Sequence, residues 1–101
     1  MWFAIIAEDV ADTLEARKAA RPAHLERLHQ LQAEGHMLLA GPFPAIESND
    51  PGPAGFTGSL IVAEFTTQAD AESWARADSY VAAGVYRQVV IKPFRQVLPA
   101  A

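Results

Sequence analysis

The sequence has no cysteine, only 8 lysines and arginines against 12 acidic residues, and no long apolar run. The absence of cysteine excludes disulfides, thiol nucleophiles and thiolate metal ligands, and it makes a reducing cytoplasm the expected location. The scattered basic residues and the net charge of -4 argue against a nucleic acid partner. No apolar segment approaches the ~18 residues that a membrane span needs, so we expect a soluble protein with no membrane partner.

The apolar residues that are present suffice for one packed core. Half of the 101 residues are hydrophobic, which suits a single domain over residues 1–101. Apolar runs predict four strands, at residues 2–7, 36–43, 59–65 and from Tyr86 to an end at Pro93.

Two helical segments separate these strands. Pro22 cannot donate a backbone hydrogen bond, so we expect a break there and a main helix from Pro22 to Glu34, closed by Gly35. Thr67 begins a capping pattern that predicts a second helix ending near Asp78, followed by a short turn.

The resulting order of elements is βαββαβ. Right-handed crossovers fold this order into an α+β, ferredoxin-like domain with a four-stranded antiparallel sheet and both helices on one face. At least two strands, residues 2–7 and 59–65, are apolar on both faces. Because the helices cover one face only, we predict a homodimer in which two copies pack through their sheet faces.

His24 is the first candidate for acid-base chemistry. On a helix that starts at Pro22, it shares the apolar side with Leu28 and Leu31, and the positive end of the helix dipole favours its neutral form, able to act as a base. A half-buried histidine bonded to a backbone carbonyl is the alternative. His29 points about 140° away, so the two histidines do not form a metal site.

Asp78 is the second candidate. It lies on the apolar side of its helix, where a carboxylate needs a partner. One interpretation is that Asp78 caps the short turn after it. The other is that it orients His24 in an acid-base pair. The residues alone leave both interpretations open.

The stretch "AGPFPAIESNDPGPAGFTG", residues 40–58, joins two strands and has apolar residues of its own. We therefore interpret it as a defined long loop, neither a linker nor a disordered spacer. It has no lysine and precedes a strand, which argues against a phosphate-binding loop. Ser48, Ser59 and Ser73 lack the context of a nucleophilic serine.

Several motifs together resemble the YciI-like family over nearly the whole chain: "RPAHLERLHQLQAEG", "LLAGPFPA", "SNDPGPAGFTGSLIVAEF", "ADSYVAAGVY" and "IKPF". The resemblance implies a dimeric α+β barrel, similar in fold to muconolactone isomerases, with His24 and Asp78 as a catalytic pair. Relatives usually have proline where this chain has Ser79. The resemblance also makes the loop a wall of the substrate cavity, with these residues as the predicted substrate-binding set: Gly41, Pro42, Phe43, Ser48, Phe56, Gly58 and Ser59.

The family has few assigned substrates, and one branch resembles dehydrochlorinases of chlorinated hydroxyhydroquinones. The resemblance and the residues together predict a small enzyme without a cofactor or metal, of lyase or isomerase type, acting on a small aromatic or enolisable molecule. Loop amides near Gly41 and Gly58 are expected to hold an oxyanion. The alternative is a dimeric module that binds a small molecule, or serves as an accessory protein, without catalysis.

Overall fold

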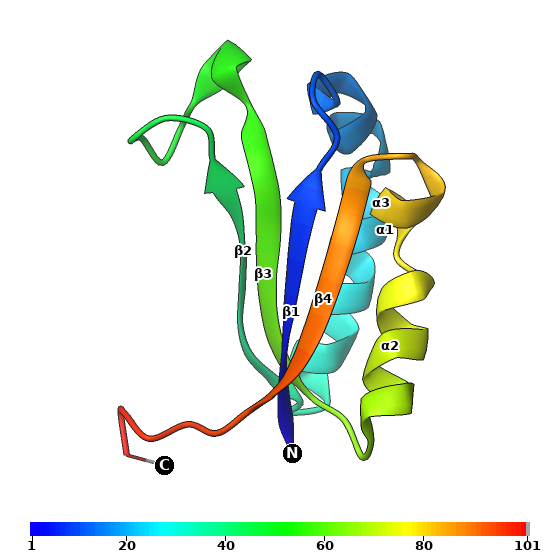
Figure 1. Cartoon of the computed structure of the whole chain (residues 1–101), viewed down its shortest axis with the longest axis vertical. Helices are drawn as coiled ribbons and strands as arrows, with labels where there is room; N and C mark the ends of the chain where they lie inside the picture. Colours follow the sequence, from blue (N-terminus) through cyan, green and yellow to red (C-terminus); the bar gives the residue numbers. More distant parts are fainter. Residues whose placement is uncertain (101) are drawn as a thin grey trace.

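The computed structural model describes residues 1–100, and Ala101, the last residue of the predicted domain, lies outside them. The elements follow in the predicted βαββαβ order (Figure 1), with a short extra helix and a 3-10 turn. Their bounds are β1 (Trp2–Asp9), α1 (Leu14–Ala33), β2 (Met37–Pro44), η1 (Gly52–Ala54), β3 (Phe56–Glu64), α2 (Gln68–Arg76), α3 (Ser79–Ala82) and β4 (Tyr86–Phe94).

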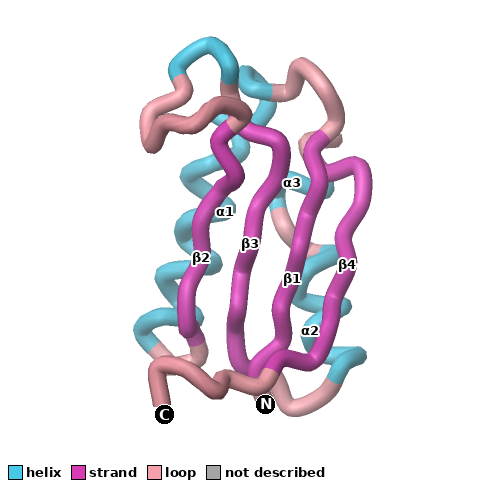
Figure 2. The backbone as a smooth tube through the Cα atoms, turned by 60° about the vertical axis from the view of Figure 1, so that its left-hand side comes forward, coloured by secondary structure: helices cyan, strands magenta, loops and turns pink. Residues whose placement is uncertain are grey.

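The strands form one antiparallel sheet in the order β2-β3-β1-β4. All three α-helices lie on the same side of it, and the other face is open (Figure 2). The predicted α+β, ferredoxin-like topology is therefore confirmed. Among residues 1–100, no helix is long and apolar enough to cross a membrane.

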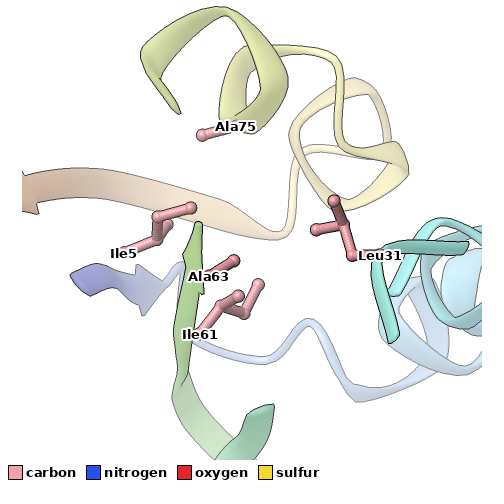
Figure 3. Packing of buried hydrophobic residues seen from close by; sticks show 5 residues of the cluster. All are labelled: Ile5, Leu31, Ile61, Ala63 and Ala75. Atoms are coloured by element: carbon pink, nitrogen blue, oxygen red, sulfur yellow. The ribbon is translucent and has the colours of Figure 1, made fainter. Parts of the chain in front are cut away.

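The core lies between the sheet and the helices. Ile5 in the central strand β1 is paired with Ile61 on one side and Ile91 on the other, so three branched side chains meet in one row. Leu31 of α1 and Ala75 of α2 pack over this row from the helical layer (Figure 3). Such burial stabilises the fold by about 1.5–3 kcal/mol per large side chain and fixes α1 against β3.

The predicted helix break at Pro22 is wrong. α1 is continuous from Leu14 to Ala33 with Pro22 inside it. Pro22 is exposed, so the helical hydrogen bond that it cannot make is lost on the solvent side, where water can bond the freed carbonyl. Three buried residues of α1, spaced seven apart at Arg17, His24 and Leu31, hold the helix on the sheet despite that cost.

Two predicted strand ends also need correction. β3 starts at Phe56, three residues before the predicted Ser59, because Gly58 and Phe56 still pair with β2. β4 runs through Pro93 to Phe94, because an edge strand tolerates a residue without an amide hydrogen.

Candidate acid-base site on the first helix

His24 and Asp78 are in direct contact, although 54 residues separate them in the chain. The Nδ1 atom of His24 lies 2.9 Å from both carboxylate oxygens of Asp78, and both residues are buried. A carboxylate only accepts hydrogen bonds, so Nδ1 donates and the lone pair of a neutral ring lies on Nε2. Within residues 1–100, no hydrogen bond occupies Nε2. This nitrogen is the atom available to a ligand.

α3 holds Asp78 in this position. Asp78 has an extended backbone and caps α3, its Oδ1 accepting from the amide of Tyr80 at 2.9 Å. The hydroxyl of Ser79 donates to the carbonyl of Ala20 in α1, at 3.0 Å, a bond that proline at this position would not make. One carboxylate therefore both caps α3 and contacts His24, and the role of this contact in acid-base chemistry stays a prediction.

The ring of Tyr80 covers one face of the imidazole. The two ring centroids are 4.0 Å apart with 15° between the planes, a stacked arrangement that limits rotation of His24. Burial raises the pKa of Tyr80, and the nearby positive charges of Arg17 and Arg21 partly oppose this. Burial likewise raises the pKa of Tyr86, which meets Tyr80 edge to face. Both phenols are therefore neutral at physiological pH.

His24 lines a cavity of about 180 Å³ between α1 and the β2 side of the sheet. α1 contributes Arg17, Arg21, His24, Leu25 and Leu28, and β2 contributes Ala40, Gly41 and Pro42. Ser59 and Ile61 of β3 and Tyr80 of α3 complete the lining. The cavity thus joins apolar surface to a few polar groups, as small-molecule sites do.

Arg17 connects the cavity to a buried ion pair. Its Nε atom donates to Asp9 at 3.0 Å, and the two side chains are 7% and 2% exposed. Its Nη2 atom donates to the carbonyl of Gly58 at 3.0 Å and to the hydroxyl of Ser59 at 2.7 Å. The guanidinium also lies over the rings of Phe56 and Tyr80. Arg17 therefore fixes Ser59 and Tyr80 beside His24.

Arg17 was not predicted from the sequence, and the false break at Pro22 is the reason. On a continuous helix, residues seven apart lie within about 20° of each other, which would have placed Arg17 on the side of His24. The break also misplaced His24 in the first helical turn, whereas it is deep inside α1. The helix dipole therefore does not act on His24, and its orientation comes from Asp78 and Tyr80.

Three of the predicted substrate-binding residues, Gly41, Pro42 and Ser59, line the cavity with His24. Gly58 lies beside it, but its carbonyl accepts from Arg17, and it is paired with Glu8 in β1. The oxyanion role of the amides near Gly41 and Gly58 stays a prediction.

The other three predicted residues are not among the cavity lining. Phe56 lies under the Arg17 guanidinium, at 5.3 Å. Phe43 is on the open face of the sheet, where its partner in β3 is Gly58. Ser48 is exposed and bonds Asp50 within its own loop. No group of three or more metal-ligating side chains occurs among residues 1–100.

These observations define a class of protein, namely a ferredoxin-like α+β domain with a buried His–Asp pair beside a small cavity. The chain belongs to the YCII-related domain family, whose model matches residues 1–95, so the resemblance seen in the sequence is confirmed. It is 58% identical to Protein YciI of Escherichia coli O6:H1 over 97 residues, covering 96% of this chain and 99% of that protein. An uncharacterised protein of Haemophilus influenzae is 52% identical over the same share of both chains.

One solved structure is similar over 94% of both chains, with a TM-score of 0.81 and 23% sequence identity. It is the 5-chloro-2-hydroxyhydroquinone dehydrochlorinase of Burkholderia phenoliruptrix AC1100 in complex with 2,5-dihydroxybenzoquinone. At this identity the likeness shows a shared fold.

Proposed function

We propose that the protein is a small enzyme of lyase or isomerase type that needs no cofactor and uses His24 and Asp78 as an acid-base pair. One observation carries this proposal. A buried carboxylate holds Nδ1 of a histidine that lines a cavity, which leaves Nε2 for a ligand. The same arrangement makes histidine a general base in many enzymes.

The chemistry follows from the two nitrogen atoms. Nε2 accepts a proton from a phenolic hydroxyl or an acidic carbon of the substrate, and Asp78 stabilises the imidazolium that forms. In one case, the electron pair left on the substrate then expels a leaving group, as in a dehydrochlorinase-like reaction. In the other, the same His24 returns the proton to the substrate anion at another carbon. The first outcome is lyase chemistry and the second is isomerisation.

A second candidate is a module that binds a small molecule, or serves a partner protein, without catalysis. This candidate is favoured because both residues also have structural roles: Asp78 caps α3, and His24 packs on Tyr80. In that case His24 only hydrogen-bonds the ligand. The open cavity supports ligand binding over a purely accessory role.

Variants of the pair separate these two functions. We expect His24→Gln and Asp78→Asn to lower kcat/KM by at least about a hundredfold for any phenol or enol that the parent converts, because the first removes the general base and the second removes the charge that stabilises its imidazolium. Asn retains the capping of α3, so the Asp78 variant keeps its fold. His29→Gln is the matched control, because His29 is exposed on the same helix. The measurement is substrate loss by mass spectrometry across a screened set of compounds.

Equal turnover by the parent and both variants would exclude a catalytic pair. A compound that raises the melting temperature of the parent yet stays chemically unchanged would favour the binding module.

We also propose that the protein is a homodimer packed through its sheet faces. Four large apolar side chains on the open face are exposed by 38–47%: Ile6, Leu39, Phe43 and Phe94. Val62, Leu60 and Val90 lie in the same rows. A contiguous apolar face of this kind is typical of an interface between copies.

We expect the parent to sediment as a dimer at micromolar concentration and Ile6→Lys to sediment as a monomer, because the lysine would be buried without a partner. Val81→Lys is the control, since Val81 is equally exposed, at 38% against 39%, but lies on α3. Sedimentation velocity distinguishes the species. A monomeric parent, or equal dissociation of the two variants, would exclude this interface.

A further inference from the structure

We propose that the cavity beside His24 selects small monoanions built on a single ring, with Arg21 supplying the charge and Ser59 a directed hydrogen bond. The inference rests on the proposed function in that it concerns the same cavity, but it is a statement about binding and holds with or without catalysis.

The charges of the lining point to an anion. The ionisable side chains that line the cavity are Arg17, Arg21, His24 and Tyr80, and none of them is acidic. Asp9 neutralises Arg17, and Asp78 is directed at His24 behind the cavity. Arg21 has no ion pair within residues 1–100 and is exposed to solvent. A positive charge at the cavity is thus left for the ligand to compensate.

The hydroxyl of Ser59 points to the same conclusion. Ser59 is 3% exposed and lines the cavity. Its oxygen accepts a short bond from the Arg17 guanidinium, which Asp9 holds in place. That bond leaves the serine proton free to donate, and the hydroxyl of Tyr86 lies close enough for a hydrogen bond from Ser59 to oppose the rise in the pKa of Tyr86. A hydroxyl polarised by a guanidinium is a strong donor for a carboxylate, enolate or phenolate oxygen.

The size of the cavity limits the ligand. An apolar cavity of about 150 Å³ holds one benzene molecule. At about 180 Å³, this cavity has room for one six-membered ring with a few substituent atoms. Leu25, Leu28 and Ile61 supply apolar surface for the ring, while Arg21 and Ser59 bind the anionic group.

Benzoate and benzamide are a suitable pair of ligands, because they share shape and differ in charge. We expect benzoate to shift the amide resonances of Gly41 and Ser59 and to bind about tenfold more tightly than benzamide, the effect of one hydrogen bond to a charged group. Arg21→Gln abolishes this preference. Lys18→Gln retains it, because Lys18 is an exposed cation of the same helix, paired with Glu15 and outside the cavity. Nuclear magnetic resonance titration of the full chain measures all of these constants.

Ser59→Ala tests the second donor. We expect it to weaken the binding of benzoate and of benzamide by up to about tenfold each, because a carboxylate oxygen and an amide oxygen both accept the serine proton. Ser73→Ala, an exposed serine on α2, leaves both unchanged. Near-ultraviolet circular dichroism confirms that each variant keeps the parent's packing.

Three results would overturn the inference. They are no binding of benzoate, equal affinity for benzoate and benzamide, or an equal loss of the benzoate preference in Arg21→Gln and Lys18→Gln. His24→Gln separates this inference from the proposed function. If that variant keeps the benzoate preference and no compound is converted by the parent, the anion site stands and catalysis fails. If the parent converts a neutral compound but does not distinguish the two ligands, catalysis stands and the anion site fails.

Discussion

Arg17→Met should lower the free energy of unfolding by about 3–5 kcal/mol, because it leaves the carboxylate of Asp9 buried without a partner. The side chain of Asp9 is 2% exposed, and its two oxygens receive both the Nε and the Nη2 bonds of Arg17. The variant also removes the donors to Gly58 and Ser59. Urea denaturation at one fixed protein concentration measures the loss.

A second substitution shows whether the buried charge is the cause. We expect Arg17→Met combined with Asp9→Leu to regain most of the lost stability, since replacing a buried pair by apolar residues is often neutral or stabilising. Lys18→Met is the control, because this exposed lysine has only a solvent-exposed partner, and it should change stability by less than about 0.5 kcal/mol. A loss in Arg17→Met no larger than in Lys18→Met would show that the pair does not stabilise the fold.

Gly58→Ala should lower the free energy of unfolding by about 3 kcal/mol or more, which is at the upper end of the effect of overpacking. A Cβ atom at Gly58 would lie 2.1 Å from the carbonyl oxygen of Ala7 in the neighbouring strand and 3.2 Å from the ring of Phe43. The first contact is with backbone, so no side-chain rotation relieves it. β1 and β3 would have to move apart beside Ser59, which pairs with Ala7.

Gly41→Ala is the matched control for this prediction. A Cβ atom at Gly41 meets nothing within 4 Å, so we expect a change of less than about 0.5 kcal/mol. Urea denaturation of both variants at equal protein concentration gives the comparison. If the free energy of unfolding of Gly58→Ala lies within about 1 kcal/mol of the parent's, the close approach of the two strands is contradicted.

The sequence predicted the topology because its signals are local. Apolar runs locate the strands, and the ends of helices have local markers: Gly35 and Gly84 have positive φ angles of 78° and 73°, and Thr67 caps α2 as expected. Strand and helix order then leaves few possible folds. The predicted break at Pro22 was wrong because the packing of α1 on the sheet outweighs the low helix propensity of proline. The local sequence of α1 does not indicate this packing.

The site was harder to predict because it depends on contacts between distant residues. Spacing and polarity on an apolar face identified His24 and Asp78, but only the packing of α3 on α1 brings the two together. Arg17 and Tyr80 escaped notice because an arginine or tyrosine on a helix is ordinarily a surface or core residue. The family resemblance placed Ser48 in the cavity wall, whereas Ser48 bonds Asp50 within its own loop and is not among the residues that line the cavity.

Asp78 both contacts His24 and caps α3, so the arrangement of the site depends on the local folding of α3. The oxygen that bonds His24 also bonds the Tyr80 amide, so opening of the α3 turn releases the imidazole and removes its stacked ring at the same moment. We therefore expect His24 to lose its fixed orientation whenever α3 frays. Hydrogen exchange at the single amide of Tyr80 therefore reports how often the whole site comes apart.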